Sequence, residues 1–470
     1  MTGTARVRVA IAIILIAGWA LTLGLSWPGH LSFDSIVQLH DGRTGFYHSW
    51  HPPVMAWLLG VGDAIFPGTG LYVIVATTLI FGSFFALLWT RSRASWAAVL
   101  LAVLFVPLPQ FLLYPMIVWK DVLFAAAGVA SFVCLALAEA HWKHWHIRIG
   151  LVATSFLLTV LATLARQNGL IALIAIAASF AWIVARNSNW ARGVVCGIAA
   201  LVAAGVTAFA ISFVLAVHSD GGEGTRTQLR LLRFYDLVGA VAADPHLPLD
   251  TLTDEEPGLE ALMRSDGRRL YSPERNDTLV GSPALQNALG QAEPGTIAAQ
   301  WYDLVRDHPW LYLKVRADVF AQVLFTPDIE GCRPVFTGVE GPTGEMEDPG
   351  MAPRRDARDL ALAHYAKGFM GTPAFSHAFY GILALAALVL LLRRRAPGDI
   401  AMAFLLASAL VFTASFFMIS IACDYRYLYY LDMAALSAVF YLALDPSYLF
   451  AVVAIWSGSF WDSRSEERKS

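Results

Sequence analysis

The segment Trp27-Pro-Gly-His-Leu-Ser-Phe-Asp34-Ser-Ile-Val-Gln38, followed shortly by Trp50-His-Pro-Pro53, decides how the rest of the chain is interpreted. It brings a carboxylate, a glutamine, histidines and a Pro-Pro pair together directly after the first long apolar run. Ionisable residues at the edge of apolar spans are costly, and they usually face a cavity or a partner. We therefore predict that Asp34 carries chemistry at one membrane face and that the remaining chain forms the scaffold around it.

The composition is that of a membrane protein. Of 470 residues, 57% are hydrophobic and only 15% are charged, and the mean hydropathy is +0.57. A soluble globular protein carries about 25% charged residues. The net charge of -3 is uninformative, because charges of the two signs are segregated along the chain. Without a domain-scale basic face, nucleic acid is not an expected partner. The expected fold class is an all-α polytopic membrane protein, with the lipid bilayer as its surroundings.

Ten segments are long and apolar enough to cross a bilayer, because a hydrocarbon core of about 30 Å needs about 20 apolar residues per helix. They are 7–27, 70–90, 95–113, 121–140, 148–165, 169–186, 193–217, 374–392, 399–421 and 431–456. The segment 53–66 is apolar but short and carries Asp63, so we predict an interfacial or half-inserted helix, with a true span as the alternative. The first run is long for a signal peptide and shows no clear cleavage site, so we expect it to be retained.

The distribution of basic residues orients these spans, since cytoplasmic loops are rich in Lys and Arg. With the N-terminus inside, the inner loops hold Arg6, Arg8, Arg91, Arg93, Lys143, Arg148, Arg186, Arg192, Arg393, Arg394, Arg395 and the tail residues Arg464, Arg468 and Lys469. The short outer loops hold only Arg43, Lys120, Arg166 and Arg426. This bias predicts ten spans with both chain ends in the cytoplasm.

Four regions follow from this topology. They are an N-terminal transmembrane module 1–217 whose first outer loop is 28–69, an extracytoplasmic region 218–372, C-terminal transmembrane helices 373–456, and a cytoplasmic tail 457–470. In the outer region, apolar spacing predicts helices over 229–243 and 297–324, with Pro309 in a first helical turn. Gly and Pro make 330–356 a loop. Cys332 and Cys423 both fall outside and could pair, although spacing alone leaves this open.

Polar residues gather at the predicted outer face from four parts of the chain. They are Asp34, Gln38, His48 and His51 in the first loop, Trp119-Lys120-Asp121, Arg166-Gln-Asn168-Gly169, and Asp424-Tyr-Arg426-Tyr427-Leu-Tyr-Tyr430. Asp34 is the candidate general base, because an apolar wall disfavours the charged carboxylate and raises its basicity. The structural alternative is that Asp34 is only a helix N-cap.

The basic residues of this set are candidates to hold a phosphate. Arg166 and Arg426 would do so through a bidentate guanidinium and Lys120 as a point charge. The alternative is ion pairing with Asp121 or Asp424. His51 could donate to phosphate or ligate a metal, although one His and one Asp are far from a metal-site pattern. The tyrosines from 425 to 430 are more typical of an interfacial belt than of substrate contacts.

Other catalytic motifs are absent from the sequence. There is no Gly-rich phosphate loop followed by Lys and Ser or Thr, no His-Glu-x-x-His, no Gly-x-Ser-x-Gly and no Cys-x-x-Cys. These motifs carry nucleotide binding, zinc proteolysis, serine hydrolysis and thiol redox chemistry. The sequence therefore offers no site for a cytosolic nucleotide.

The order of these motifs resembles that of the multi-spanning GT-C glycosyltransferases, closest to a poorly characterised bacterial branch. The motifs are Pro28-Gly29, Asp34-Ser35, Gln38, His51-Pro52, Trp119-Lys120-Asp121, Arg166-x-Asn168-Gly169 and Arg426-Tyr427. The likeness extends from residue 1 to about 456. Each motif is short, so the specificity of the resemblance lies in their order and shared face. It implies a GT-C-like bundle of about ten transmembrane helices with a mainly helical extracytoplasmic segment.

The resemblance also implies a function. It is the inverting transfer of a sugar from a polyprenyl-phosphate donor to a glycan, lipid or protein acceptor, on the outer side of the bacterial inner membrane. Asp34 maps onto the catalytic base of the family. The residues expected around the donor phosphate are Lys120, Arg166, Arg426, His51, Gln38, Asp121, Asn168 and Tyr427. Many family members have two adjacent acids where this chain has Asp34-Ser35, so no metal ligand is assigned and a divalent metal is left open.

Three other functions are weighed against this one. A polymerase or ligase for preassembled lipid-linked glycans would share the donor type and the outer site. A transporter or flippase without chemistry typically shows inverted repeats and broken helices near the bilayer midplane, whereas here the polar residues sit at one face and no internal repeat is evident. A structural or interaction protein is the last alternative.

Overall fold

The computed structural model describes residues 3–347 and 351–446, and every regular element in these ranges is a helix. Nine helices in these ranges are long and apolar enough to cross a membrane. They are α1 Gly3–Ser26, α4 Gly70–Leu87, α7 Lys120–Ala140, α8 Trp145–Ala165, α9 Leu170–Asn187, α10 Trp190–Ala216, α20 His377–Arg394, α21 Asp399–Ile419 and α22 Tyr429–Leu444, the last extended by the short helix η5 Tyr425–Leu428. The expectation of an all-α polytopic membrane protein is confirmed.

The third predicted span, 95–113, is not one straight helix. The structure divides it into α5 Trp96–Phe105 and a second part formed by α6 Pro109–Leu112 and η1 Tyr114–Met116, bent by 72° against the first. Pro107 and Pro109 explain the break, because proline lacks an N–H and restricts the residue before it. Of the last predicted span, 431–456, the residues from 447 on lie outside the described residues, as does the tail 457–470.

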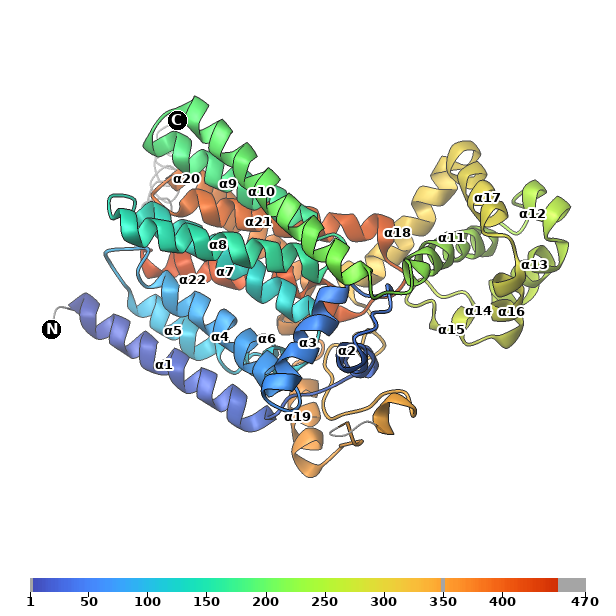
Figure 1. Cartoon of the computed structure of the whole chain (residues 1–470), viewed down its shortest axis with the longest axis horizontal. Helices are drawn as coiled ribbons and strands as arrows, with labels where there is room; N and C mark the ends of the chain where they lie inside the picture. The colour runs from blue at the N-terminus through green and yellow to red at the C-terminus, as the bar shows by residue number, and fades with distance from the viewer. Residues whose placement is uncertain (1–2, 348–350, 447–470) are drawn as a thin grey trace, which may run out of the picture.

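The centre of the bundle is formed by α7 and α22. In α7, 94% of the membrane-spanning stretch is buried inside the protein, and for α22 with η5 the share is 89%. The α7 run Ala125-Ala-Ala-Gly128 permits this, because small residues let neighbouring helices approach closely. A Cβ on Gly128 would lie 3.0 Å from the ring of Tyr430. Figure 1 shows the remaining spans around this centre, with α8, α9 and α10 along one side and α1 along the other.

Two short helices, α2 Phe33–Thr44 and α3 Pro53–Ile65, follow α1 and form the first loop. They touch backbone to backbone, since a Cβ on Gly42 would lie 2.2 Å from the Ala56 carbonyl oxygen. Arg43 and Asp63 join them by an ion pair of 2.8 Å. The predicted helix over 53–66 is confirmed, and its 13 residues place it below the length of the nine spans.

The region after α10 forms a helical unit with a hydrophobic core of its own (Figure 1). Its helices are α11 Glu223–Ala243, α12 Asp250–Glu255, α13 Pro257–Leu262, η2 Met263–Gly267, α14 Arg268–Leu270, α15 Asp277–Val280, α16 Pro283–Gln291, α17 Pro294–Asp307 and α18 Pro309–Phe325. The two predicted helical stretches and the first-turn position of Pro309 are confirmed. Within this core, Arg316 is fully buried and paired with Asp236.

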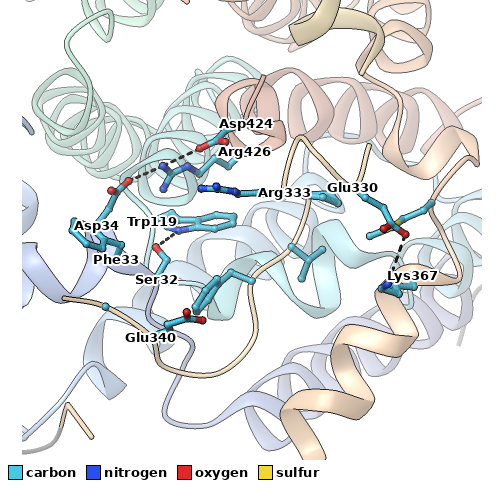
Figure 2. Close-up of a pocket in the computed structure, with 15 residues that line it drawn as sticks. Ser32, Phe33, Asp34, Trp119, Glu330, Arg333, Glu340, Lys367, Asp424 and Arg426 are labelled. Atoms are coloured by element: carbon cyan, nitrogen blue, oxygen red, sulfur yellow. Dashed lines mark hydrogen bonds and ion pairs between the residues drawn. The ribbon is translucent and has the colours of Figure 1, made fainter. Parts of the chain in front are cut away.

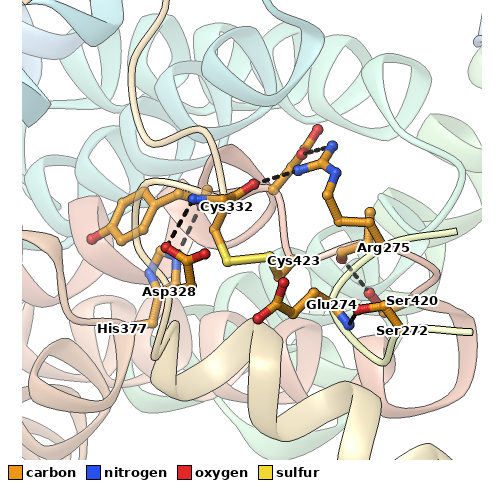
Figure 3. The surroundings of a disulfide bond; sticks show 12 residues. Ser272, Glu274, Arg275, Asp328, Cys332, His377, Ser420 and Cys423 are labelled. Atoms are coloured by element: carbon orange, nitrogen blue, oxygen red, sulfur yellow. Dashed lines mark hydrogen bonds and ion pairs between the residues drawn. A yellow bond between two sulfur atoms is a disulfide. The ribbon is translucent and has the colours of Figure 1, made fainter. Parts of the chain in front are cut away.

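The chain then returns to the bundle along a loop interrupted by η3 Glu345–Glu347, and α19 Ala357–Lys367 and η4 Pro373–Phe375 lead into α20. Cys332 in this loop forms a disulfide with Cys423 (Figure 3). The Tyr425 N–H also donates to the Cys332 carbonyl at 2.9 Å. The pairing that the sequence left open is thus present, and it fixes the loop next to η5.

Candidate active site

Asp34 lies in the first turn of α2, at the end of the bundle that we call the Asp34 end. The N-cap of this helix is Ser32, and the Ser32 N–H donates to Ser35 Oγ at 3.2 Å. Ser35 Oγ in turn donates to the Val118 carbonyl at 2.6 Å, which fixes α2 against the segment before α7. The alternative that Asp34 is the cap is therefore wrong. Its carboxylate is left to face other side chains.

Three chain segments meet at the Asp34 carboxylate. Arg426 Nη2 donates to Asp34 Oδ2 at 2.6 Å, and His51 Nε2 lies 3.8 Å from Oδ1. Lys120 Nζ lies 2.8 Å from His51 Nδ1. When Lys120 is an ammonium group it donates to His51 Nδ1, and the proton of the neutral ring then sits on Nε2, facing Asp34. Gln38 supports the site from within, because its Nε2 donates to the Asp34 carbonyl at 2.9 Å.

Arg426 is shared among several carboxylates. Besides Asp34, its Nη2 lies 3.2 Å from Asp424, and its Nε lies 4.0 Å from Asp121. The guanidinium also stands over the Trp119 ring, 5.0 Å from the centroid. Asp424 has a second partner from the outer helical unit, since Arg275 Nη2 donates to it at 2.8 Å. Figure 2 shows Asp34, Arg426 and Asp424 in one row above Trp119.

Arg166 forms the inner layer of the site. It is buried and paired with the buried Asp121. Its guanidinium faces the rings of Phe412, Phe416 and Tyr427, at 5.4–5.7 Å from their centroids. Tyr427 stacks on Phe416 and also lies 5.7 Å from Arg426. The alternative predicted for Arg166 and Arg426 was ion pairing with Asp121 or Asp424. Both pairs are present, Arg166 with Asp121 and Arg426 with Asp424.

A cleft of about 590 Å³ opens beside this network. Asp34 and Arg426 line one side together with Ser32, Phe33, Trp119 and Asp424, and the loop 330–341 with Lys367 and Met370 lines the other (Figure 2). The side chain of Asp34 is 26% exposed and that of Arg426 14% exposed. Lys120 and Arg166 are not part of this lining. Of the three basic residues predicted to hold phosphate, Arg426 alone faces the cleft, and an anion there would also meet the more exposed Arg333 and Lys367 of the opposite wall.

The electrostatics of Asp34 differ from the sequence prediction. Burial raises its pKa, as predicted, but the Arg426 guanidinium and His51 outweigh burial and hold the pKa of this carboxyl well below its usual range. The expectation of raised basicity is therefore wrong for this state. That prediction considered only the apolar surroundings of Asp34 and not the guanidinium of Arg426 that faces it. Burial and the nearby Lys120 lower the pKa of His51 to about 4, so its ring is neutral at pH 7.

Other predicted residues lie further out. His48 Nδ1 is paired with Asp41 at 2.8 Å, away from Asp34. Asn168 Nδ2 donates to Ser415 Oγ at 3.0 Å, which holds the turn between α8 and α9 against α21. Tyr429 and Tyr430 are almost fully buried between helices, so the prediction of an interfacial belt is wrong for them. Their hydroxyls bond Gln110 and Ser408 instead of interfacial water.

A buried network that the sequence analysis missed fixes η5, the element that carries Arg426. His377 Nδ1 lies 2.8 Å from Asp432, and its Nε2 lies 2.9 Å from the Tyr425 carbonyl. The Tyr425 hydroxyl donates to the other oxygen of Asp432 at 2.8 Å. The available signal was a histidine and an aspartate inside apolar spans. Arg275, Arg333 and Lys367 gave no signal, because they lie in hydrophilic segments where charge is ordinary.

The residues around Asp34 do not fit a divalent cation. Within 3–347 and 351–446 there is no group of three or more His, Cys, Asp or Glu side chains that could hold a metal. Ca²⁺ and Mg²⁺ take about six oxygen ligands, whereas Asp34 faces a guanidinium and an imidazole. Arg426 already occupies the position that a cation would take beside this carboxylate.

Comparisons with known proteins give matches among solved structures. No protein-family model and no curated protein matches this chain. The oligosaccharyltransferase AglB from Archaeoglobus fulgidus, in complex with an inhibitory peptide and a dolichol-phosphate, matches 94% of this chain and 51% of its own, at 16% identity and a TM-score of 0.39. ArnT from Cupriavidus metallidurans, bound to undecaprenyl phosphate, matches 94% of this chain and 78% of its own, at 16% identity and a TM-score of 0.34.

Both solved proteins are GT-C glycosyltransferases. This is the superfamily that the motifs of the sequence resemble. The chain spans about half the length of the oligosaccharyltransferase chains that it matches. At 16% identity and TM-scores of 0.39 and 0.34 the likeness carries no argument about this chain, so the roles of individual residues rest on the contacts described above.

Proposed function

We propose that this chain is a membrane glycosyltransferase that moves a sugar from a polyprenyl-phosphate donor to an extracytoplasmic acceptor with inversion at the anomeric carbon. The observation that carries the proposal is the Asp34–Arg426 pair on the wall of a cleft at one end of the membrane spans. A carboxylate and a guanidinium side by side can accept a proton and hold a phosphate. The lipid tail of such a donor would stay in the bilayer while its phosphate reached Arg426.

The chemical step uses these two side chains in opposite roles. Asp34 takes the proton of an acceptor hydroxyl, and that oxygen attacks the anomeric carbon from the side opposite the phosphate. The bond between the anomeric carbon and the phosphate oxygen breaks, and its electron pair leaves with polyprenyl phosphate. Arg426 stabilises the charge that develops on the leaving phosphate, with Lys120 and Arg166 adding positive potential from behind.

Donor binding also prepares the base. Before binding, Arg426 Nη2 is held by Asp34 at 2.6 Å. A donor phosphate competes for the same guanidinium, because phosphate and carboxylate both accept its bidentate hydrogen bonds. Once Arg426 turns toward phosphate, the main lowering influence on Asp34 weakens and its burial raises its pKa. The carboxylate then becomes a stronger base when the donor is present.

Location on the outer side is part of the proposal. The arginines at the ends of the spans lie mainly at the end opposite Asp34, where Arg91, Arg186 and Arg394 are found. The positive-inside rule assigns that end to the cytoplasm. The Cys332–Cys423 disulfide lies at the Asp34 end, and disulfides persist in oxidising compartments outside the cytosol. Both observations support a site on the extracytoplasmic side of the membrane, which the proposal takes to be the inner membrane of a bacterium.

Calorimetric titration of the purified protein in nanodiscs with undecaprenyl phosphate tests this proposal. We expect saturable binding that Arg166→Ala and Arg426→Gln weaken. Run at pH 5 in buffers of different ionisation enthalpy, the titration also counts protons. The wild type should take up more protons on binding than Asp34→Asn, because only the wild type has a carboxyl whose pKa rises.

The experiment tests the donor site and the change of partner by Arg426 separately. Absence of binding of undecaprenyl phosphate and of its sugar conjugates by folded protein would contradict the donor assignment and favour a ligase or a transporter. Binding with equal proton uptake in wild type and Asp34→Asn would still support the donor site. It would contradict the proposal that Arg426 moves from Asp34 to the donor phosphate.

A further inference from the structure

A second cavity lies at the end of the bundle opposite Asp34. Its volume is about 400 Å³, and it lies where α9 ends, α10 begins and α20 turns into α21. Trp182 and Trp190 form two of its walls, edge to face, with ring centroids 6.1 Å apart. Ala185 and Ile400 add apolar surface. The cavity is thus amphipathic, because its remaining lining consists of arginines.

Of the two arginines in this cavity, Arg186 is paired with an acid, whereas Arg395 carries positive charge that no acid of residues 3–347 or 351–446 neutralises. Arg186 donates to Glu139 at 3.2 Å and to the Arg395 carbonyl at 2.9 Å, so its guanidinium is held in place. Arg395 donates its Nε to the Leu392 carbonyl at 2.9 Å, and it forms no ion pair with a residue of 3–347 or 351–446. Among the described residues, no acid occupies the remaining N–H groups of Arg395, which leaves them available for an anion.

The nearest acids have other partners. Asp399 is bound by Arg91, Arg394 and the Tyr441 hydroxyl. Glu139 accepts the Gly398 N–H at 2.6 Å in addition to Arg186. Both carboxylates are thus committed to the protein. An anion that enters the cavity meets two guanidiniums without displacing an existing pair at Arg395.

The apolar side of the cavity continues along α10. Trp182 is 44% exposed and Trp190 66% exposed, and Val195 and Ile198 further along α10 are 66% and 57% exposed. A bilayer covers such a face, and tryptophan favours the boundary between headgroups and acyl chains. A soluble anion would use only the arginines and would leave this apolar continuation unexplained.

We propose that this cavity binds one anionic phospholipid of the adjoining leaflet. Its phosphate lies between Arg395 and Arg186, its glycerol lies against the two tryptophans, and its acyl chains follow α10. Basic pockets between transmembrane helices on the cytoplasmic side suit anionic headgroups, because a guanidinium forms paired hydrogen bonds with phosphate oxygens. The bound lipid joins α9, α10 and the turn before α21, and the inference does not depend on the proposed transfer reaction.

The test is native mass spectrometry of the full chain, titrated with phosphatidylglycerol or with phosphatidylcholine of the same acyl chains. The wild type should retain one phosphatidylglycerol in preference to phosphatidylcholine. Arg395→Gln should weaken that binding about five-fold, the effect of one cation near an anionic lipid surface. Trp190→Ala should weaken binding of both lipids.

Two matched variants complete the test. Arg395→Lys keeps the charge and should retain the preference for phosphatidylglycerol. Arg93→Gln removes an exposed arginine at the same end, outside the cavity, and should behave as the wild type. Equal retention of the two lipids by the wild type would overturn the proposal. So would an unchanged preference in Arg395→Gln, or an equal loss in Arg93→Gln.

Discussion

Two arginine–carboxylate networks stand at opposite ends of the same helices, and they are built differently. Asp399 is completely buried and accepts from Arg91, Arg394, the Ala396 N–H and the Tyr441 hydroxyl. The guanidinium of Arg91 also stands over the Tyr441 ring, 4.7 Å from its centroid. Every acceptor site of this carboxylate is used within the protein.

The network around Asp34 shows the reverse arrangement. Its carboxylate is partly exposed on a cleft and holds one arginine, and that arginine is shared with Asp424. A saturated, enclosed network cannot exchange partners without leaving a buried charge unpaired. A shared arginine at a cleft can exchange one anion for another at little cost. The comparison predicts that the Asp399 network maintains stability and that the Asp34 network carries function.

The largest effect is expected for Asp34→Asn. Sugar transfer from a polyprenyl-phosphate donor should fall about 1,000-fold, within the range that a general base contributes, while the temperature of unfolding changes little. The measurement is product formation with labelled donor, beside thermal unfolding of the same sample. Asp318→Asn, an exposed acid on α18, is the control and should transfer normally. Full activity of Asp34→Asn would remove Asp34 from the mechanism.

Asp399→Asn should show the opposite profile. It leaves two guanidiniums without their carboxylate, and breaking such a buried pair costs about 3 kcal/mol of stability. Chemical or thermal unfolding in detergent measures this loss, and the affinity for undecaprenyl phosphate should be preserved in the folded fraction. If Asp34→Asn were destabilised as strongly as Asp399→Asn, the distinction between the two networks would be lost.

Arg426→Lys sharpens the comparison at the cleft itself. Lysine keeps the charge but loses the fork that reaches both Asp34 and a phosphate. Turnover should fall about 100-fold, the size expected when one donor to a developing charge is removed. Arg275→Lys tests Asp424 from the other side and should have a smaller effect, because Arg275 does not line the cleft. Equal losses in both variants would mean that Arg426 acts only through Asp424.

The smallest of these effects concerns the disulfide. Replacing Cys332 and Cys423 together by serine should lower the free energy of unfolding by about 2 kcal/mol. Hydrogen exchange should increase in the loop that carries Arg333 and around η5, and it should not change around Asp399. An increase in hydrogen exchange spread evenly over the molecule would show that the disulfide does not act locally on the cleft.

The sequence by itself determined the spans and which polar residues are unusual. Hydropathy is a local property, so nine helices and the short α3 followed from windows of adjacent residues, whereas 95–113 was predicted as a single span and the structure breaks it. The predicted topology also placed Asp34, Lys120, Arg166 and Arg426 at one face. That prediction needed only the alternation of spans across the membrane.

Tertiary structure alone decided how these residues pair. Arg426 and Asp34 are 392 positions apart in the chain, and nothing local to either one shows that they touch. The sequence therefore predicted a base of raised pKa, because it recorded the apolar surroundings of Asp34 and not the guanidinium opposite. The Cys332–Cys423 bond and the saturation of Asp399 likewise depend on how distant helices pack. Burial can be anticipated from composition, whereas the charge that a buried group faces is fixed only by the fold.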